Sequence, residues 1–227
     1  MKIQVPKKEI KFQSNEITVR QKSMFAVQHL LAAARFSRQC GKIQLEHMGE
    51  SLGSFHSEMT ACVSATVMLS VASLESNINE HLSDPDNIFG NLPKYIRNEL
   101  SVMSAEMQIL EKYQKILIFN NLSPFERGKK PYQDVSDLIQ LRNELVHFHP
   151  EWHDIQKRHK NLGNRLRNKF ELSPFIKEDS DVIFPPRIIS HGCTKWAVKS
   201  SLSFMENFEE LLKLESKFKK IYDQLEA

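Results

Sequence analysis

The stretch DLIQLRNELVHFHPEWHD, residues 137–154, combines an apolar helical pattern with side chains that could do chemistry. At 100° per residue, its leucine, isoleucine and valine side chains cover one continuous arc of a helix, and Arg142 falls near the middle of that arc. Asn143 and His147 lie together just past the edge of the arc. Because an unpaired charge in a core is costly, we expect Arg142 either to have an acidic partner or to face a polar cleft.

Glu75 is the acidic partner that the sequence offers. It ends a helical stretch that carries no charged residue after Glu58, and it lies at the margin of the apolar stripe of that stretch. Asn79 stands one turn further on the same side. Two interpretations are open: Glu75 and Arg142 form an ion pair that clamps two helices, or they belong to a functional cleft.

The segment LRNELVHFH resembles the R-N-x-x-x-H form of the RX4–6H motif of HEPN domains, with Arg142, Asn143 and His147 in the three motif positions. Upstream lies the uncharged helical stretch, which ends in SLESNINEHL, and downstream a segment with FP, HG and WA leads into a final long helix. This order is similar to that of the HEPN domains of bacterial defence and toxin proteins. The resemblance covers roughly residues 54–215, and the first fifty residues lie outside it.

The resemblance implies a metal-independent endoribonuclease in which the motif residues of two copies meet across a homodimer interface. The 2′-hydroxyl of RNA would attack the neighbouring phosphate, with His147 as the acid–base residue, because imidazole exchanges protons near neutral pH. Arg142 would clamp the phosphate oxygens with its planar guanidinium. Asn143 would orient the reacting groups by hydrogen bonding, and Glu75 would hold the Arg142 side chain in its rotamer.

The resemblance also implies partners, but no cofactor. The partners are RNA, a second copy of this chain and an antitoxin or defence-system protein. In some toxin members, a tyrosine two positions after the motif histidine is modified by a partner nucleotidyltransferase. That position is His149 in this sequence, so regulation of that type is not supported.

A second interpretation of the motif region is a metal site. The segment HFHPEWH places His147, His149 and His153 close together. However, Pro150 breaks the helix between them, no regular helical pair exists among the three, and no cysteine is near. We therefore expect no metal here.

A basic stretch, KRHKNLGNRLRNK, follows the motif and contains no acidic residue between positions 155 and 170. Its cations are Lys157, Arg158, Lys160, Arg165, Arg167 and Lys169. Such a stretch is either a solvated helix face or, beside an RNA-cleaving motif, a wall that binds RNA phosphates. The absence of interleaved aromatic residues argues against base stacking along it.

Composition describes an ordinary soluble protein of 227 residues, with a formal net charge of +3 and a pI near 8.7. The three cysteines are far apart and form no CxxC pair, which predicts reduced thiols in the core of a cytoplasmic protein. The N-terminus has no apolar signal segment, and no uninterrupted apolar run reaches the ~18–20 residues of a membrane span. Seven glycines leave little scope for a phosphate-cradling loop.

Helical periodicity predicts an all-α bundle with a long loop before its last helix. The helices are expected at about 23–39 with Gly41 as its stop, 54–82, 93–120, 131–150, 154–170 and 191–225. The helix over 54–82 should be the central and most buried one. Weak alternation near the N-terminus favours a short extended arm or hairpin, so we divide the chain into an N-terminal extension with the first helix (1–50) and a HEPN-like helical domain (51–227).

Two further classes of function compete with the endoribonuclease. One is a non-catalytic HEPN module that binds a protein or nucleotide partner, in which Arg142 and Glu75 are purely structural. The other is a helical metal-binding protein. The RNA target is not specified by any of these patterns.

Overall fold

The computed structural model describes residues 9–13, 16–20, 22–90, 92–103, 106–152, 157–176 and 182–226. Its elements, in chain order, are β1 (Glu9–Gln13), β2 (Glu16–Arg20), α1 (Ala26–Glu46), α2 (Phe55–Leu82), α3 (Pro85–Ile88), α4 (Lys94–Met103), α5 (Ile109–Phe119), α6 (Tyr132–Val146), α7 (Lys157–Leu166), η2 (Pro186–Ile188), α8 (His191–Leu211), η3 (Lys219–Ile221) and α9 (Tyr222–Leu225).

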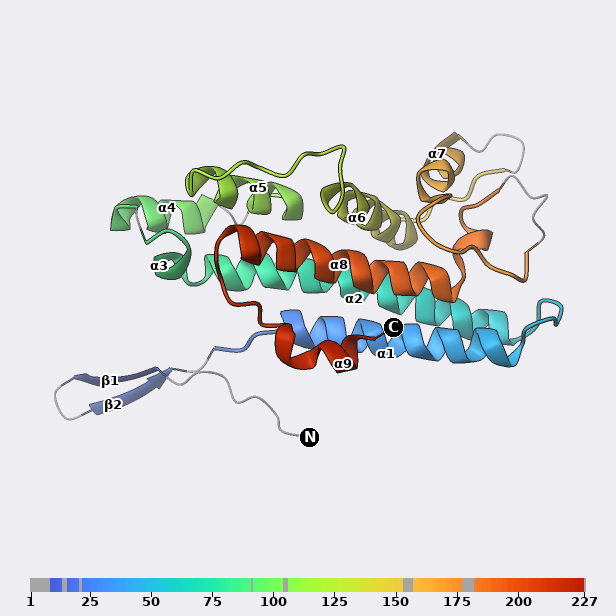
Figure 1. Ribbon diagram of the computed structural model, residues 1–227, viewed down its shortest axis with the longest axis horizontal. Coiled ribbons are helices and arrows are strands. Elements are labelled where there is room, and N and C mark those ends of the chain that lie inside the picture. Colours follow the sequence, from blue (N-terminus) through green and yellow to red (C-terminus); the bar gives the residue numbers. More distant parts are fainter. Residues whose placement is uncertain are drawn as a thin grey trace.

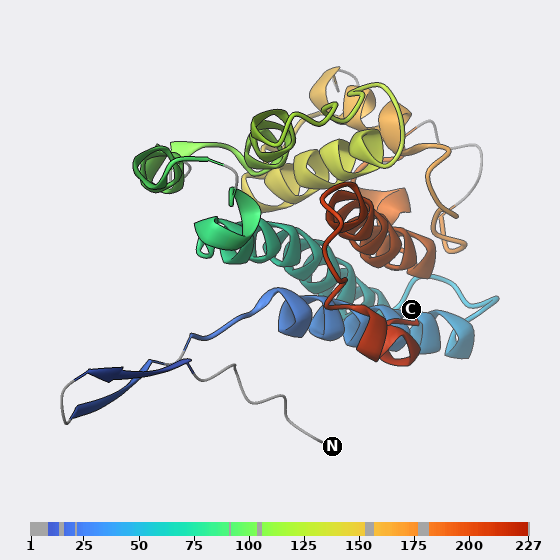
Figure 2. The ribbon, with the colours of Figure 1, turned by 60° about the vertical axis from the view of Figure 1, so that its left-hand side comes forward.

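The body of the molecule is helical, which confirms the predicted all-α class. Strands β1 and β2 form an antiparallel hairpin in which Glu9 is opposite Arg20 and Phe12 is opposite Ile17. The hairpin stands apart from the helical body in both ribbon views (Figures 1 and 2). The expected N-terminal hairpin is therefore present, and the helices alone build the core.

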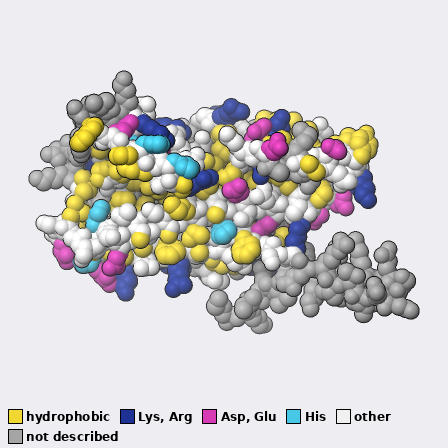
Figure 3. All heavy atoms as spheres, turned by 180° about the vertical axis from the view of Figure 1, so that it is seen from behind, with side chains coloured by type: hydrophobic (Ala, Val, Ile, Leu, Met, Phe, Trp, Pro, Cys, Tyr) yellow, Lys and Arg dark blue, Asp and Glu magenta, His cyan; other side chains and the backbone are white. Residues whose placement is uncertain are grey.

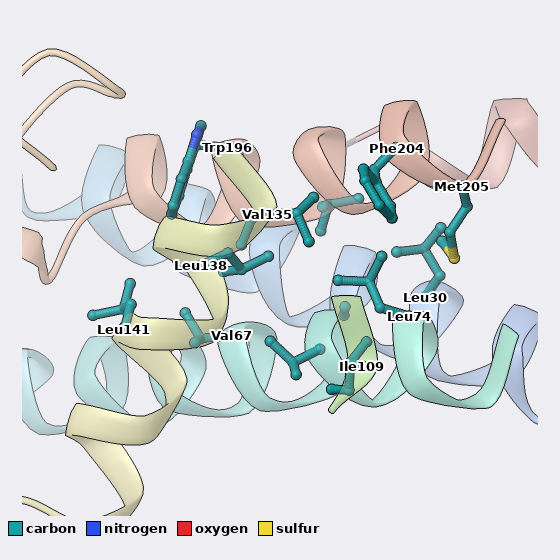
Figure 4. Packing of buried hydrophobic residues seen from close by; sticks show 14 of the residues in the cluster. Leu30, Val67, Leu74, Ile109, Val135, Leu138, Leu141, Trp196, Phe204 and Met205 are labelled. Atoms are coloured by element: carbon teal, nitrogen blue, oxygen red, sulfur yellow. The ribbon is translucent and has the colours of Figure 1, made fainter. Parts of the chain in front are cut away.

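Helix α2 packs against α1, α8, α6 and α5, and α1 and α8 also pack directly against each other (Figure 1). Its predicted apolar stripe is fully buried and consists of Val63, Val67, Val71, Leu74 and Ile78. Each fully buried side chain of this kind contributes about 1.5–3 kcal/mol relative to leaving it in water. The core around this helix confirms its central position (Figure 4), but α2 is not the most buried helix, because 13 of its 28 residues are buried against 11 of the 21 residues of α8.

Helix α2 is also long and apolar enough to cross a membrane by length and composition, although no uninterrupted apolar run of that length exists in the sequence. Half of the qualifying window is buried inside the helical bundle. The core helix of a soluble protein meets the same criteria, so this finding assigns no membrane location.

The prediction that the first helix stops at Gly41 is wrong, because α1 continues to Glu46. The glycine has a packing role, because a Cβ atom at this position would lie 2.7 Å from Nδ1 of His191. The His191 backbone N–H donates to Oε1 of Gln44 at 2.8 Å, which joins the start of α8 to the same turn of α1. Helix α1 thus belongs to the same hydrophobic core as α2 and α8 and is not an extension outside it.

The helix predicted over 93–120 is divided into α4 and α5, and the one predicted over 191–225 ends at Leu211. Lys213 adopts a left-handed backbone conformation (φ 56°), and the chain then turns back along α1. Phe218 and Leu225 are buried there, so the C-terminal segment closes the core and does not form an exposed coiled-coil-like end.

The three cysteines are free thiols and are buried, as the sequence predicts for small core residues. Burial, together with the neighbouring Cys62, raises the pKa of Cys40 to about 12. Burial also raises the pKa values of Cys62 and Cys193. The thiols are therefore protonated packing groups at neutral pH.

Candidate functional site

The motif occupies the last turn of α6. This helix places Val135, Leu138 and Leu141 against α2 and α8 (Figure 4). It ends at Val146, and the backbone N–H of the following residue, His147, donates to the carbonyl of Asn143 at 2.8 Å. The helix therefore stops before the proline at position 150, and the motif side chains project from its C-terminal end.

The three motif side chains differ in burial. Asn143 and His147 are exposed, in agreement with their position past the apolar arc. Arg142 is half-buried and, within the described part of the chain, has no hydrogen bond or ion pair. Arg142 is thus a partly desolvated cation that has no carboxylate partner among the described residues, and His147, at the end of the same helix, is open to solvent.

The ion pair expected between Glu75 and Arg142 is not formed. Glu75 is exposed on α2, and no interaction joins it to Arg142. Asn79, one turn further along α2, accepts a hydrogen bond from Nζ of Lys112 on α5 at 2.8 Å. The edge of α2 that carries Asn79 thus faces α5. Glu75 takes no part in the site described below.

The basic stretch contacts α6 through carboxylates that the sequence analysis did not consider. Nε of Arg158 lies 2.7 Å from Oε2 of Glu144. The guanidinium of Arg165 is bonded to Asp137, and Nζ of Lys169 is bonded to Asp134. We call these three cations and three acids the α6–α7 ion-pair cluster.

The acids of the cluster are buried, although they are charged. Asp134, Asp137 and Glu144 are 7%, 1% and 5% exposed. Burial alone would lower the pKa of Lys169, but hydrogen bonds and charge from Asp134 and Asp137 outweigh it and raise the pKa. A buried carboxylate without a counterion is strongly destabilising, so these cations are needed where they lie.

The cluster corrects the interpretation of the basic stretch. Arg158, Arg165 and Lys169 pair with carboxylates of α6, while the side chains of Arg158 and Arg165 remain 45% and 43% exposed, so the stretch is not a simple solvated face, and its binding of RNA phosphates stays a prediction. Lys160 and Arg167 are exposed and carry no interaction in the described part of the chain. The side chain of Lys157 lies outside the described residues.

A cavity of about 310 Å³ adjoins the C-terminal end of the motif helix. It is lined by Phe148, Pro150, Glu151, His159, Val182, Pro185 and Pro186. Seen from behind, the end of the molecule that carries α7 shows histidine and basic side chains beside a hydrophobic area (Figure 3). No sequence pattern indicates this cavity, because its walls come from three segments that are separated in the chain.

The metal interpretation gains no support from the described residues, which contain no group of three His, Cys, Asp or Glu side chains that could hold an ion. His147 and His149 are exposed. His153, the third member of the expected triplet, lies outside the described residues.

Comparisons with protein-family models, with curated proteins and with solved structures found no match to this chain.

Proposed function

We propose that this protein is a metal-independent endoribonuclease of the HEPN type, with Arg142 and His147 as its reacting residues and Asn143 as an orienting residue. The observation that carries the proposal is the state of Arg142, which is half-buried beside the exposed His147 and has no counterion within the described part of the chain. A bacterial defence or toxin setting and a cytoplasmic location belong to the same proposal.

The surrounding charges support this choice. The three buried acids of α6 are each matched by a cation from the following segment, and none is left over for Arg142. A partly buried guanidinium without a protein counterion is available to an anion from outside, and its planar donor fork fits two phosphate oxygens.

The chemistry follows from these side chains. The 2′-oxygen forms a bond to phosphorus as His147 accepts the hydroxyl proton, and the bond from phosphorus to the 5′-oxygen breaks. The 5′-oxygen leaves as a hydroxyl after it receives a proton from the imidazolium of a second copy. Arg142 stabilises the additional negative charge on the phosphorane oxygens. The products are a 2′,3′-cyclic phosphate and a 5′-hydroxyl end.

A second copy of the chain is part of the proposal, because one histidine cannot act on both sides of the phosphate in the same step. Two apolar side chains beside the motif support an interface there. Val146 and Trp152 are 47% and 82% exposed in the single chain, and a second copy would cover them.

The test uses end-labelled single-stranded RNA with the purified protein in excess EDTA. We expect cleavage, and product ends that a phosphatase removes only after acid opens the cyclic phosphate. His147→Ala should abolish the cleavage, and His149→Ala, which changes an exposed histidine outside the motif, should not. Activity that disappears with the chelator and returns with a divalent cation would contradict the proposal.

One observation favours a second candidate, a non-catalytic HEPN module. Arg142 lies about one turn before the C-terminal end of α6, whose last turn carries no basic residue, and a cation near that end stabilises the negative end of the helix dipole. In that case Arg142→Ala would lower the melting temperature of a protein that never cleaves RNA.

A further inference from the structure

The hairpin of β1 and β2 stands apart from the helical body in both ribbon views (Figures 1 and 2). It is a sheet of two strands, so each strand has one edge that no other strand covers in the described structure. A hairpin of two strands without a core to pack on is only marginally stable. An uncovered strand edge is a row of backbone N–H and C=O groups that can pair with another chain. The hairpin is therefore a candidate interaction surface.

The register of the hairpin separates its apolar and polar residues. Opposite residues of an antiparallel pair lie on the same face, and successive residues of a strand alternate between the two faces. Ile10 is opposite Val19 and Phe12 is opposite Ile17, so these four positions share one face. The charged residues of both strands lie at the positions of the other face. A further strand that preserves these faces must place apolar positions opposite apolar positions.

Strand β2 is complementary to a second copy of itself. When two β2 strands pair antiparallel with Thr18 opposite Thr18, all five residues of each strand are aligned. Glu16 of one copy is then opposite Arg20 of the other, and the twofold symmetry repeats this pair. Ile17 is likewise opposite Val19, so the apolar positions stay on one face. Opposite charges at directly opposite positions stabilise a strand pair.

Other edge contacts between two hairpins fit less well. Two β1 strands aligned over all five residues place Lys11 opposite Lys11, and like charges directly opposite are destabilising. Pairing of β1 with the β2 strand of another copy leaves a free β1 edge and a free β2 edge, so it adds further copies and does not close. A shift of the β2 pair by two residues removes both contacts between Glu16 and Arg20.

We infer that the hairpin joins two copies of this chain through their β2 strands, with a twofold axis at Thr18. The strand order of the joined sheet is β1–β2–β2–β1. Its four strands and single apolar face meet the requirement of three or more strands for a sheet that is stable by itself. The hairpin lies at the end of the molecule opposite α7 (Figure 1), so this contact is separate from the motif interface proposed for cleavage. Two different twofold contacts on one chain build a tetramer or a longer array.

Cysteine cross-linking tests this register in the full-length protein. In Thr18→Cys the two introduced residues are directly opposite, with Cα atoms about 4.5–5.5 Å apart, which a disulfide can span. A mild oxidant should therefore convert most of the protein to a disulfide-linked dimer on a non-reducing gel. The native cysteines are buried, so the introduced thiol is the accessible one.

Lys11→Cys is the matched control, because Lys11 is opposite Thr18 within the hairpin. In the joined sheet, however, the two Lys11 positions are three strand spacings apart, roughly 14 Å, which is too far for a disulfide. Lys11→Cys should therefore form at least fivefold less dimer than Thr18→Cys. Equal cross-linking of the two variants, or a Thr18→Cys protein that stays monomeric on the gel, overturns the inference.

Charge exchange in the Thr18→Cys protein gives a second test. Glu16→Lys places two cations opposite each other, and Arg20→Glu places two anions opposite each other. Each variant alone should form at least fivefold less cross-linked dimer. In an equimolar mixture every charge again meets its opposite, so the mixed dimer, identified by tags of different length, should form as readily as with Thr18→Cys alone. A mixture that does not restore cross-linking overturns the inference.

The hairpin contact and the proposed cleavage can fail independently. If Thr18→Cys forms the dimer and RNA is never cleaved, the contact between β2 strands stands and the endoribonuclease does not. If RNA is cleaved in EDTA and Thr18→Cys forms no dimer, the reverse holds.

Discussion

Arg142 differs from the other partly buried cations at this end of the molecule. Arg158 and Lys169 each neutralise a carboxylate of α6, and their loss would leave that acid uncompensated. Arg142 has no such partner in the described structure, so its removal leaves no buried acid behind. The effects of an Arg142 substitution on RNA cleavage and on stability therefore distinguish a catalytic role of this residue from a structural one.

Arg142→Ala should abolish RNA cleavage and change the free energy of unfolding by less than about 1 kcal/mol, as for other substitutions that break no buried pair. His147→Ala should behave in the same way, because the side chain is exposed. Cleavage assays and urea unfolding of both variants check this. A large loss of stability in Arg142→Ala with cleavage intact would identify a helix-end cation and support the non-catalytic module.

His191 gives the stability a pH dependence. Burial lowers the pKa of its imidazole in the folded protein, and Lys195 lowers it further. The unfolded chain therefore binds more protons below the ordinary value of 6.5, so the contribution of this group is present above that pH and is lost as the pH falls. We expect unfolding midpoints in urea to decrease from about pH 7.5 to about pH 5.5, and to decrease less in His191→Asn. An equal decrease in both proteins would exclude His191 as the source.

At the level of elements, the contact between α6 and α7 depends on ionic pairs beneath a partly exposed surface. The carboxylate of Asp137 is 1% exposed, whereas the side chain of its partner Arg165 is 43% exposed. Nζ of Lys169 lies 3.1 Å from the same carboxylate and can compensate in part. Removal of one cation should therefore cost less than the loss of a wholly buried pair.

Arg165→Gln should lower the free energy of unfolding by about 1–3 kcal/mol, below the roughly 3–5 kcal/mol of a fully buried pair because water screens the guanidinium. Arg167→Gln is the matched control, since Arg167 is exposed and has no interaction in the described structure. It should change stability by no more than about 0.5 kcal/mol. Urea unfolding measures both, and equal effects would show that the Asp137 pair is not structural.

The sequence predicted elements better than it predicted the contacts between them. The apolar stripe of α2 was predictable because every third or fourth residue along it is apolar. This spacing can be read from the sequence without knowing which other helices pack against α2. Gly41 was misread as a stop because its role depends on His191, which lies far away in the chain. The end of α8 was missed because Lys213, a residue without a turn preference, adopts the left-handed conformation.

The candidate site shows the same division. Burial of Arg142 and exposure of His147 follow from their angles on α6, and the sequence indicated both. The acidic partners of the basic stretch could have been predicted from the sequence, because Asp134, Asp137 and Glu144 lie on one side of α6. The cavity around His159 had none, because its walls come together only in the folded chain.

On the scale of the whole molecule, the two ends of the chain contribute differently. Oε1 of Glu80 accepts the backbone N–H groups of Phe25 and Ala26 at the start of α1, and Oε2 pairs with Nζ of Lys217 at 2.6 Å. The C-terminal segment is thus joined to α1 and α2 together. The hairpin at the other end stands apart from the bundle (Figure 2).

Deletion of residues 216–227 should lower the melting temperature by several degrees or prevent folding, because it exposes the core under Phe218 and leaves Glu80 without Lys217. Deletion of residues 1–20 should change it little. Thermal unfolding followed by circular dichroism compares the two truncations. A larger loss from the N-terminal deletion would contradict this assignment of the core.

The order of the α6–α7 ion pairs also sets the alignment of the two segments. Asp134 pairs with Lys169, Asp137 with Arg165 and Glu144 with Arg158. The residue numbers of the acids increase as those of their partner cations decrease, so the two segments run antiparallel. A slide by one helical turn, about 5.4 Å, would separate the Arg158–Glu144 and Arg165–Asp137 pairs, whereas Asp134 would keep Lys130, which lies 3.5 Å away on the same side of the contact. Only one alignment satisfies every charge. Helix α7 carries His159, which lines the cavity. The ion pairs therefore fix the position of this side of the cavity relative to the C-terminal end of α6.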